Sequence, residues 1–434
     1  MVSITPPPAY EGLPTSVHVH SSPHRPSRKS LWQDWRWILL IAISSLGAMI
    51  VVHHVGARVD KHLATRRFTA RLQAQAPSAE AYCPEYTPIL QQALAPYEIV
   101  GRTVSSVAMK EVDDFVRAGD GMRMHISAKN GKVATTPKVN RVDKYRTGNL
   151  LENIQLAQQL FGKFPFDFEF WYNAGDCPAL PRELFRSNEG VLLPPLGYAT
   201  TTGHYDVSIP YSTQAIWKED EDLSTLSELV HKHPWAGKAK RGVWRGSTTG
   251  AVRVEESNVW DLPRAVLVNV SLHNPKLLDA RFTACKHCES RVSSLLEKAG
   301  YGYAPFFTFP EQFKYQALID VDGNSWSSRF AQLLSINSVV FKQETKYVEF
   351  FRPLVKPYRH YIPVKGDLTD LASKLDKMLG EEGRKNTTAQ LKLREIGAES
   401  TRLYIQSLVP SKQLCYLHRV LDAYSRVYAQ AVFS

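Results

Sequence analysis

The 434-residue sequence predicts an α/β protein with a mostly parallel sheet, preceded by one membrane-spanning helix. Short apolar runs alternate with helical patterns across residues 240–380, the order that produces right-handed βαβ units. Within this region, residues 315–334 show the pattern of a buried strand, a tight turn and a helix. Trp37 to Ala57 contains no Asp, Glu, Lys or Arg, which favours a membrane span over a helix of a folded core.

Composition limits the classes of function. With 53 Lys+Arg against 42 Asp+Glu, the formal net charge is +11, which suits an anionic ligand or an anionic surface. Nucleic acid is not an expected partner, because the sequence lacks zinc-finger spacing, an RNP-like strand and a basic helix at heptad spacing. The hydrophobic content of 44% is enough for two cored domains.

The five cysteines are too few for a disulfide scaffold. In a lumenal protein, two disulfides and one free thiol would be natural, with the pairing left open. Cys285-Lys-His-Cys288 lacks a second pair at ligand spacing, so zinc is improbable there. The motif predicts either one half of a disulfide or two buried thiols.

The N-terminal region predicts a membrane anchor. Residues 1–34 read as a disordered cytosolic tail rich in Pro, Ser and His, and residues 35–57 as a transmembrane signal anchor flanked by tryptophans. Basic residues are nearly balanced on the two sides, so the lumenal orientation of the large part depends on two N-x-S/T sequons, at Asn269 and Asn386. A cleaved signal peptide is the alternative. Residues 58–85 form the expected stem.

Residues 86–235 form the first predicted domain. Asn149 is expected to cap a helix that stops at Gly162, and the alternating aromatics from Phe166 to Tyr172 predict a strand. Asp176 follows that strand. Because ligands of open α/β sheets bind beyond the carboxyl ends of strands, Asp176 is predicted near the chemistry; a turn-forming Asp before Cys-Pro is the alternative.

Residues 236–390 form the second predicted domain, followed by helices over 391–434. Lys240 to Arg245 predicts a strand that feeds a Gly/Ser/Thr-rich loop, able to bring backbone N–H groups close to phosphate. Asp322-Gly323 breaks the strand that starts at Tyr315, and Asn324 or Ser325 is expected to cap a helix bearing Arg329 in its first turns. Such a helix end attracts anions, so a diphosphate cradle is the prediction. An ordinary strand-to-helix junction with an exposed arginine is the alternative.

Together these stretches resemble glycosyltransferase family 90, the capsule-associated-protein and protein O-glucosyltransferase family. The resemblance runs in order through roughly 230–375, and the matching stretches are Pro234-Trp235, Trp244-Arg-Gly-Ser247 with Arg253, Asn274 to Ala280, Tyr315 to Phe330, Phe341 to Glu344, Glu349-Phe-Phe351 and Lys356 to Val364. A thinner resemblance over 140–220 rests on Asn173, Asp176 and Pro178 and on Tyr205-Asp206.

The resemblance implies a GT-B enzyme, in which two Rossmann-like domains face each other across a cleft. Residues 86–235 would be the acceptor-side domain and residues 236–390 the nucleotide-sugar-binding domain. The implied reaction is inverting transfer of a sugar, xylose or glucose, from a UDP-sugar to a glycan or protein hydroxyl in the lumen of the Golgi or endoplasmic reticulum. A catalytically silent lumenal carbohydrate-binding or scaffold protein on the same fold is the alternative.

The resemblance also implies the site. The expected donor-binding residues are Arg245, Gly246, Ser247, Thr248, Arg253, Asp322, Gly323, Asn324, Ser325, Trp326, Ser327, Ser328, Arg329 and Glu349. Asp143 is the expected general base, from its position before Gly162, and Asp176 is the second candidate. No cofactor is expected to be required, because arginines would offset the charge of the leaving UDP. A cation such as Mn at Asp320 and Asp322 is the alternative.

Overall fold

The computed structural model describes residues 70, 78–94, 114–115, 123–139, 144–185, 193–211 and 219–433. All of them belong to one compact unit, which begins at Ala64. The expected tail, the expected anchor at 35–57, most of the expected stem and Asp143 lie outside these ranges. No helix within the described ranges is both long and apolar enough to cross a bilayer.

The first half of this unit contains a five-stranded sheet with the order β2-β1-β3-β4-β5. The two pairs that involve β1 are antiparallel, and β3, β4 and β5 run parallel. The strands are β1 (Arg123–Lys129), β2 (Lys132–Val139), β3 (Phe168–Asn173), β4 (Leu196–Gly197) and β5 (Val207–Ser208). The predicted aromatic strand therefore exists as β3. Its residues Phe170, Trp171 and Tyr172 are all buried, so both faces of the strand are covered.

Helix α5 (Lys144–Phe161) lies against this sheet. It begins five residues before Asn149, so the expected cap is wrong and Asn149 lies inside the helix. The expected end is confirmed. Gly162 has φ +100°, a left-handed conformation that favours glycine and stops the helix.

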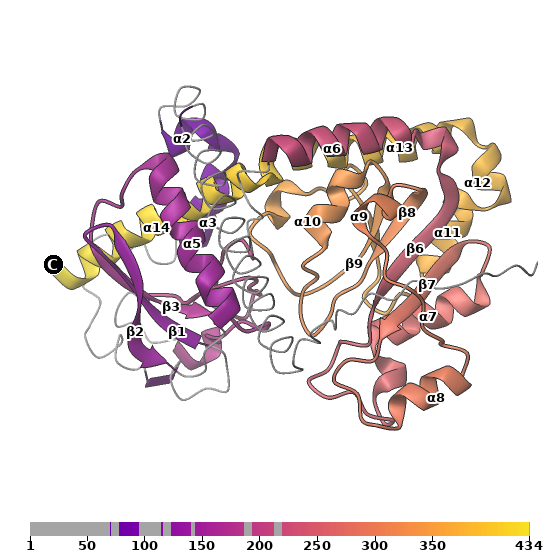
Figure 1. Ribbon diagram of the computed structural model, residues 1–434, viewed down its shortest axis with the longest axis horizontal. Coiled ribbons are helices and arrows are strands. Elements are labelled where there is room, and N and C mark those ends of the chain that lie inside the picture. Colours follow the sequence, from indigo (N-terminus) through magenta and orange to yellow (C-terminus); the bar gives the residue numbers. More distant parts are fainter. Residues whose placement is uncertain are drawn as a thin grey trace, which may run out of the picture. The chain divides into compact units, whose positions relative to one another are not determined.

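The second half contains five parallel strands in the order β10-β9-β8-β6-β7, which confirms the predicted parallel sheet. The strands are β6 (Ala239–Ser247), β7 (Leu278–Ala284), β8 (Tyr315–Asp320), β9 (Val339–Gln343) and β10 (Ile362–Val364). The helices along this part of the chain are α7 (Pro263–His273), α8 (Val292–Lys298), α9 (Phe309–Gln312), α10 (Phe330–Leu333), α11 (Leu371–Leu379), α12 (Glu381–Lys385) and α13 (Thr387–Leu403) (Figure 1). We call the two sheets the N-terminal and C-terminal sheets.

The chain passes between the two sheets twice. Helix α6 (Glu219–Lys232) leads into the C-terminal sheet. After α13, a π-helical turn (Tyr404–Leu408) leads to α14 (Pro410–Phe433), which returns to pack against α5 (Figure 1). The carboxylate of Glu219 accepts hydrogen bonds from the backbone N–H and the hydroxyl of Ser411, which fixes the start of α14. The C-terminal helices expected over 391–434 therefore serve both halves.

Two disulfides join Cys83 to Cys415 and Cys285 to Cys288, and Cys177 remains free and exposed. The expected number is confirmed, and the CxxC motif closes on itself rather than forming one half of a longer bridge. Cys83 follows the short helix α2 (Ala79–Tyr82) and precedes α3 (Thr87–Leu94), so the first disulfide ties the start of the described chain to α14.

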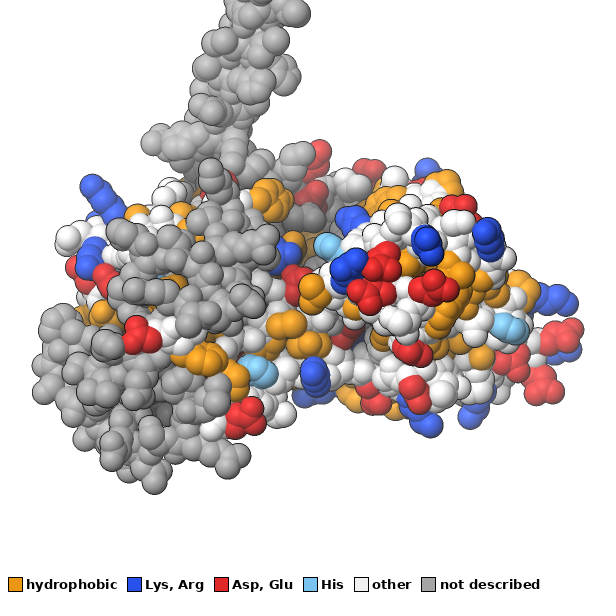
Figure 2. Space-filling model, turned by 90° about the horizontal axis from the view of Figure 1, so that it is seen from below, with side chains coloured by type: hydrophobic (Ala, Val, Ile, Leu, Met, Phe, Trp, Pro, Cys, Tyr) orange, Lys and Arg blue, Asp and Glu red, His pale blue; other side chains and the backbone are white. Residues whose placement is uncertain are grey.

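Charge is mixed on the visible surface. Figure 2 shows acidic and basic side chains interspersed over the part of the molecule that carries the C-terminal sheet. On that face, the net charge of +11 is therefore not gathered into one basic patch.

Candidate active site

The carboxyl edge of the C-terminal sheet carries two loops that contact each other. The loop after β6 and the loop after β8 meet where Gly250 N–H donates to the side-chain oxygen of Asn324, at 3.1 Å. A Cβ at Gly323 would lie 3.1 Å from Nη2 of Arg264 and 3.2 Å from Oγ1 of Thr249. Only glycine fits this approach without displacing those atoms.

Arg329 is positioned by a loop and not, as predicted, by the first turns of a helix. Helix α10 begins at Phe330 and is four residues long, so neither Asn324 nor Ser325 caps it. The Nη1 atom of Arg329 donates to the backbone oxygen of Arg245 at 2.6 Å, and its buried Nη2 has no hydrogen-bond partner. Burial lowers the pKa of this guanidinium, and Asp320, 4.0 Å away, opposes that shift. One face of Arg329 is thus available to an anion.

Arg264 is the functional candidate that the sequence reasoning missed. It lies in the first turn of α7, and its Nε and Nη1 donate to the backbone oxygens of Asp322 (2.9 Å) and Ser247 (3.0 Å). Burial, and then the nearby Arg329, lower the pKa of Arg264 to about 10. In a βα unit, the first turn of the helix lies at the carboxyl edge of the sheet, so the start of α7 after Pro263 was the available signal.

Both guanidiniums lie 5.7 Å from the ring of Trp244. The ring explains Gly246, because a Cβ there would lie 2.5 Å from a Trp244 carbon. Gly246 therefore makes room for the tryptophan, which in turn supports the paired arginines.

Three residues that were predicted to bind the donor make contacts with other parts of the protein. Arg245 is buried in an ion pair with Asp279 (3.0 Å), and its guanidinium lies over the ring of Phe307. Arg253 is mostly exposed and pairs with Glu289 at 2.7 Å. Each guanidinium thus already has a carboxylate partner distant in sequence, and a role of Arg245 and Arg253 in donor binding stays a prediction.

Thr248 is the third. It is fully buried, and its hydroxyl accepts from Lys286 N–H at 2.9 Å and lies 3.1 Å from the sulfur of Cys288. It fastens the loop after β6 to the CxxC disulfide and does not face a ligand.

The pair Asp320 and Asp322 binds an internal cation. The ammonium of Lys342 lies 3.2 Å from the carboxylate of Asp320 and 2.6 Å from that of Asp322. The hydroxyl of Ser327 also donates to Asp320, at 2.6 Å. A divalent cation would have to displace Lys342, so these residues do not fit a manganese site. In the described part of the chain, no three His, Cys, Asp or Glu side chains converge as metal ligands.

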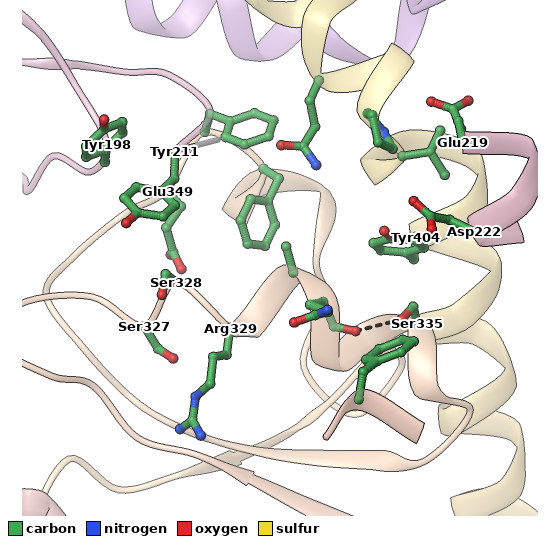
Figure 3. Close-up of a pocket in the computed structure, with 18 of the residues that line it drawn as sticks. Tyr198, Tyr211, Glu219, Asp222, Ser327, Ser328, Arg329, Ser335, Glu349 and Tyr404 are labelled. Carbon is green, nitrogen blue, oxygen red and sulfur yellow. Dashed lines mark hydrogen bonds between the residues drawn. The ribbon is translucent and has the colours of Figure 1, made fainter. Parts of the chain in front are cut away.

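Glu349 is buried beside a cavity of about 580 Å³ that residues of both sheets line. Burial raises the pKa of Glu349 to about 7, against the opposing effect of Lys342 and Arg352. Neither carboxylate oxygen has a hydrogen-bond partner. Figure 3 shows Glu349 on the same side of the cavity as Ser328 and Arg329, away from Glu219 and Asp222. The nearest cation is Arg352, whose Nε lies 3.9 Å from one of these oxygens. A buried carboxylate without hydrogen bonds is costly, which suits a ligand with hydroxyl donors.

Asp176 lies at the junction of the two sheets. It pairs with Arg146 at 3.0 Å and accepts from the side-chain amide of Asn324 at 3.2 Å. A smaller cavity of about 150 Å³ is lined there by Arg146, Asp176, Tyr211, Thr249, Gly323, Asn324, Ser325, Trp326 and Ser328. The structure thus brings Asp176 close to the loop 322–329, while its expected role in the chemistry stays a prediction. Ser325 is buried, whereas Ser328 is exposed and lines both cavities.

The two cavities are lined from both α/β halves by arginines (Arg146 and Arg329) and carboxylates (Asp176 and Glu349), an arrangement that suits a group-transfer enzyme. Comparison with known families indicates which chemical group such an enzyme would transfer. The model of glycosyl transferase family 90 matches residues 78–432, so the chain belongs to this family.

The chain is similar to named members of the family. It is 29% identical over 266 residues to protein O-glucosyltransferase 3 of Mus musculus, covering 60% of this chain and 47% of that one. It is 30% identical over 271 residues to protein O-glucosyltransferase 2 of Danio rerio (60% and 48%) and 26% identical over 281 residues to protein O-glucosyltransferase 1 of Homo sapiens (62% and 64%). The match thus spans about half the length of the first two relatives.

Among solved structures, one described as the crystal structure of TarM is 10% identical, with a TM-score of 0.31, over 57% of this chain and 52% of that one. This likeness is too low to inform the site.

Proposed function

We propose that the protein transfers a sugar, xylose or glucose, from a UDP-sugar with inversion at the anomeric carbon, and that its two halves form a GT-B cleft. The observation that carries the proposal is the Arg264–Arg329 pair. Two neighbouring guanidiniums repel each other, and a buried Nη2 without a partner adds to that cost. A bound diphosphate would relieve both, because its oxygens accept charge-assisted hydrogen bonds from arginine.

The rest of the donor would extend from this anchor. Neither carboxylate oxygen of Glu349 accepts a hydrogen bond, and a ribose presents two adjacent hydroxyls as donors, so we place the ribose there. Ser328 lines both cavities and would meet the phosphates or the sugar. As UDP leaves, negative charge grows on the diphosphate, and the paired arginines would offset it without a metal ion.

A carboxylate must take the proton from the acceptor hydroxyl while its oxygen attacks the anomeric carbon opposite the leaving phosphate. Asp143 remains the first candidate. Asp176 remains the second, although Arg146 and Asn324 already donate to its two oxygens. Replacing each of the two by Asn in turn would identify the base. The variant that lacks the base should lose sugar transfer but keep its affinity for UDP.

We propose a lumenal location in the secretory pathway, with the large part anchored by the helix predicted at 35–57. Two disulfides favour an oxidising compartment. Asn269 is exposed on α7, which leaves this sequon open to solvent. The names of the relatives suggest a protein acceptor, and we keep a glycan or protein hydroxyl as the acceptor class.

The test uses the purified full-length chain. UDP binding is measured by calorimetry, and UDP release is then followed with UDP-xylose, UDP-glucose and UDP-galactose in turn, with and without chelator. We expect UDP affinity, turnover of one of the first two donors and no loss on chelation. A folded preparation with no affinity for UDP would overturn the proposal.

A further inference from the structure

Three aromatic rings from both sheets meet beside the proposed donor site. The rings of Tyr198 and Tyr211 are 4.8 Å apart, and the ring of Trp326 lies 5.9 Å and 5.3 Å from them. Tyr198 follows β4, Tyr211 follows β5, and Trp326 belongs to the loop that also carries Gly323 and Arg329. We call Tyr198, Tyr211 and Trp326 the aromatic cluster.

The cluster has a supporting ring and two accessible rings. Tyr198 is 3% exposed, and its hydroxyl is hydrogen-bonded to that of Tyr172. Its ring is therefore held in place and supports the other two. Tyr211 is 37% exposed, and Trp326 is partly exposed. Both line each of the two cavities. Large rings left open to water inside a cavity indicate a ligand that covers them.

Charged and polar groups surround these rings. The guanidinium of Arg146 lies 5.6 Å from the ring of Tyr211, and its Nη1 donates to Asp176. Asn324 donates to the same carboxylate, and the hydroxyl of Ser328 lines the same cavities. The rings of Tyr211 and Trp326 meet edge-on, with their planes 70° apart, and so form an apolar corner bordered by planar donors and acceptors. This corner matches a sugar ring, which presents C–H groups on one face and hydroxyls around its edge. The fit to an extended apolar peptide is poorer, because the edge is charged.

We propose that the aromatic cluster is the acceptor subsite, and that the acceptor is a sugar residue of a glycan held in the corner between the rings of Tyr211 and Trp326. The inference rests on the proposed function, since the acceptor must lie next to the donor. Gly323, Asn324 and Ser328 line the smaller cavity together with both accessible rings, which gives that adjacency. The rings set acceptor class and orientation and take no part in proton transfer.

The experiment compares three variants at Tyr211 and Trp326 with one matched control in the full-length chain. The variants are Tyr211→Ala, Tyr211→Phe and Trp326→Ala. The control is Trp260→Ala: Trp260 is 38% exposed and meets Tyr301 edge-on at 5.4 Å, much as Trp326 meets Tyr211, but it lines neither cavity. Acceptors are methyl glycosides of glucose, galactose, mannose and xylose in both anomers, offered with the active UDP-sugar.

We expect both alanine variants to raise the acceptor KM at least about tenfold, the value of one lost ring contact. Tyr211→Phe should stay near wild type because it keeps the ring, and Trp260→Ala should not change the KM. Saturation-transfer NMR with UDP present should show the glycoside C–H protons against the wild type and lose them in Tyr211→Ala. The UDP affinity of Tyr211→Ala, measured separately, should be retained.

Two results would overturn the inference while UDP affinity persists. One is an unchanged acceptor KM in Tyr211→Ala and Trp326→Ala. The other is no saturation transfer to any glycoside, with transfer only to a folded protein domain. Loss of UDP affinity in the wild type would instead remove the proposed function itself, so the two failures are distinguishable.

Discussion

The two sheets differ in chemistry where they border the cavities. The carboxyl edge of the C-terminal sheet and its loops hold buried or partly buried ionisable groups, namely Arg264, Asp320, Asp322, Arg329, Lys342 and Glu349. The corresponding edge of the N-terminal sheet presents rings, and its buried Asp206 has both oxygens bonded to the backbone N–H groups of Ala179 and Leu180. We therefore expect the first edge to bind the anionic donor and the second, where Arg146 and Asp176 neutralise each other, to bind a neutral acceptor. Removing charged side chains should therefore weaken donor binding, and removing aromatic rings should weaken acceptor binding.

The largest expected effect is on the charged edge. Arg264→Ala combined with Arg329→Ala should weaken UDP binding about a thousandfold, because charge-assisted hydrogen bonds contribute roughly 1.5–3 kcal/mol each. Calorimetry with UDP measures this. Arg253→Ala is the matched control and should change affinity less than about twofold, since that side chain is exposed and paired with Glu289. If Arg253→Ala had the larger effect, the assignment of the anion site to Arg264 would be wrong.

The second effect concerns stability. Lys342→Met should lower the free energy of unfolding by about 3–5 kcal/mol, because it leaves the carboxylates of Asp320 and Asp322 buried without their cation. Urea unfolding followed by circular dichroism measures it. Adding Asp320→Asn and Asp322→Asn should restore part of the loss. A triple variant no more stable than Lys342→Met would show that the unpaired charge is not the cause.

The N-terminal half should depend more on a covalent link. Replacing Cys83 and Cys415 by Ser should cost about 2–5 kcal/mol, because this disulfide closes a loop of 332 residues. The same change at Cys285 and Cys288, three residues apart, should cost less in thermal unfolding. Equal losses in both variants would contradict the loop-length explanation.

The smallest effect depends on pH. Burial raises the pKa of Glu349 to about 7, above the 4.5 usual for Glu, so the folded state keeps a proton that the unfolded state releases first. Wild-type stability should therefore fall between about pH 4.5 and 7, relative to Glu349→Gln, by at most about 3 kcal/mol. UDP affinity should instead rise around pH 7, where the carboxylate of the folded protein ionises and can accept from the ribose. The two profiles of Glu349→Gln should be flatter; parallel profiles in both proteins would exclude this group.

The sequence predicts features that depend on contacts between residues close together in the chain, and it fails where the contacts join residues far apart. The strand that starts at Tyr315 and its end before Gly323 depend on neighbours in the chain, and both are found as predicted. The state of an arginine depends on residues far away. Arg245 is neutralised by Asp279 of the adjacent strand, and no spacing rule indicates this partner.

The same limit applies to Thr248 and Arg264. A hydroxyl in a Gly/Ser/Thr loop resembles a phosphate ligand until the chain around Lys286 is seen to bind it. Arg264 lies 11 residues beyond Arg253, and only the return of α7 to the sheet edge shows which of the two lies beside Arg329 and the loop after β8. The predicted helix at Asn324 is replaced by a loop, because tertiary contacts with Gly250 and Asp176 bind its side chain instead.

The return of α14 to α5 has a consequence for synthesis. A ribosome adding roughly 5–20 residues per second needs roughly 20–70 seconds to get from Cys83 to Cys415. During that time the N-terminal sheet lacks the helix that covers it, while all strands of the C-terminal sheet emerge earlier than that helix. The half of the nascent chain that is made first is thus completed last, and it is the half we expect to need chaperones and a disulfide-forming enzyme.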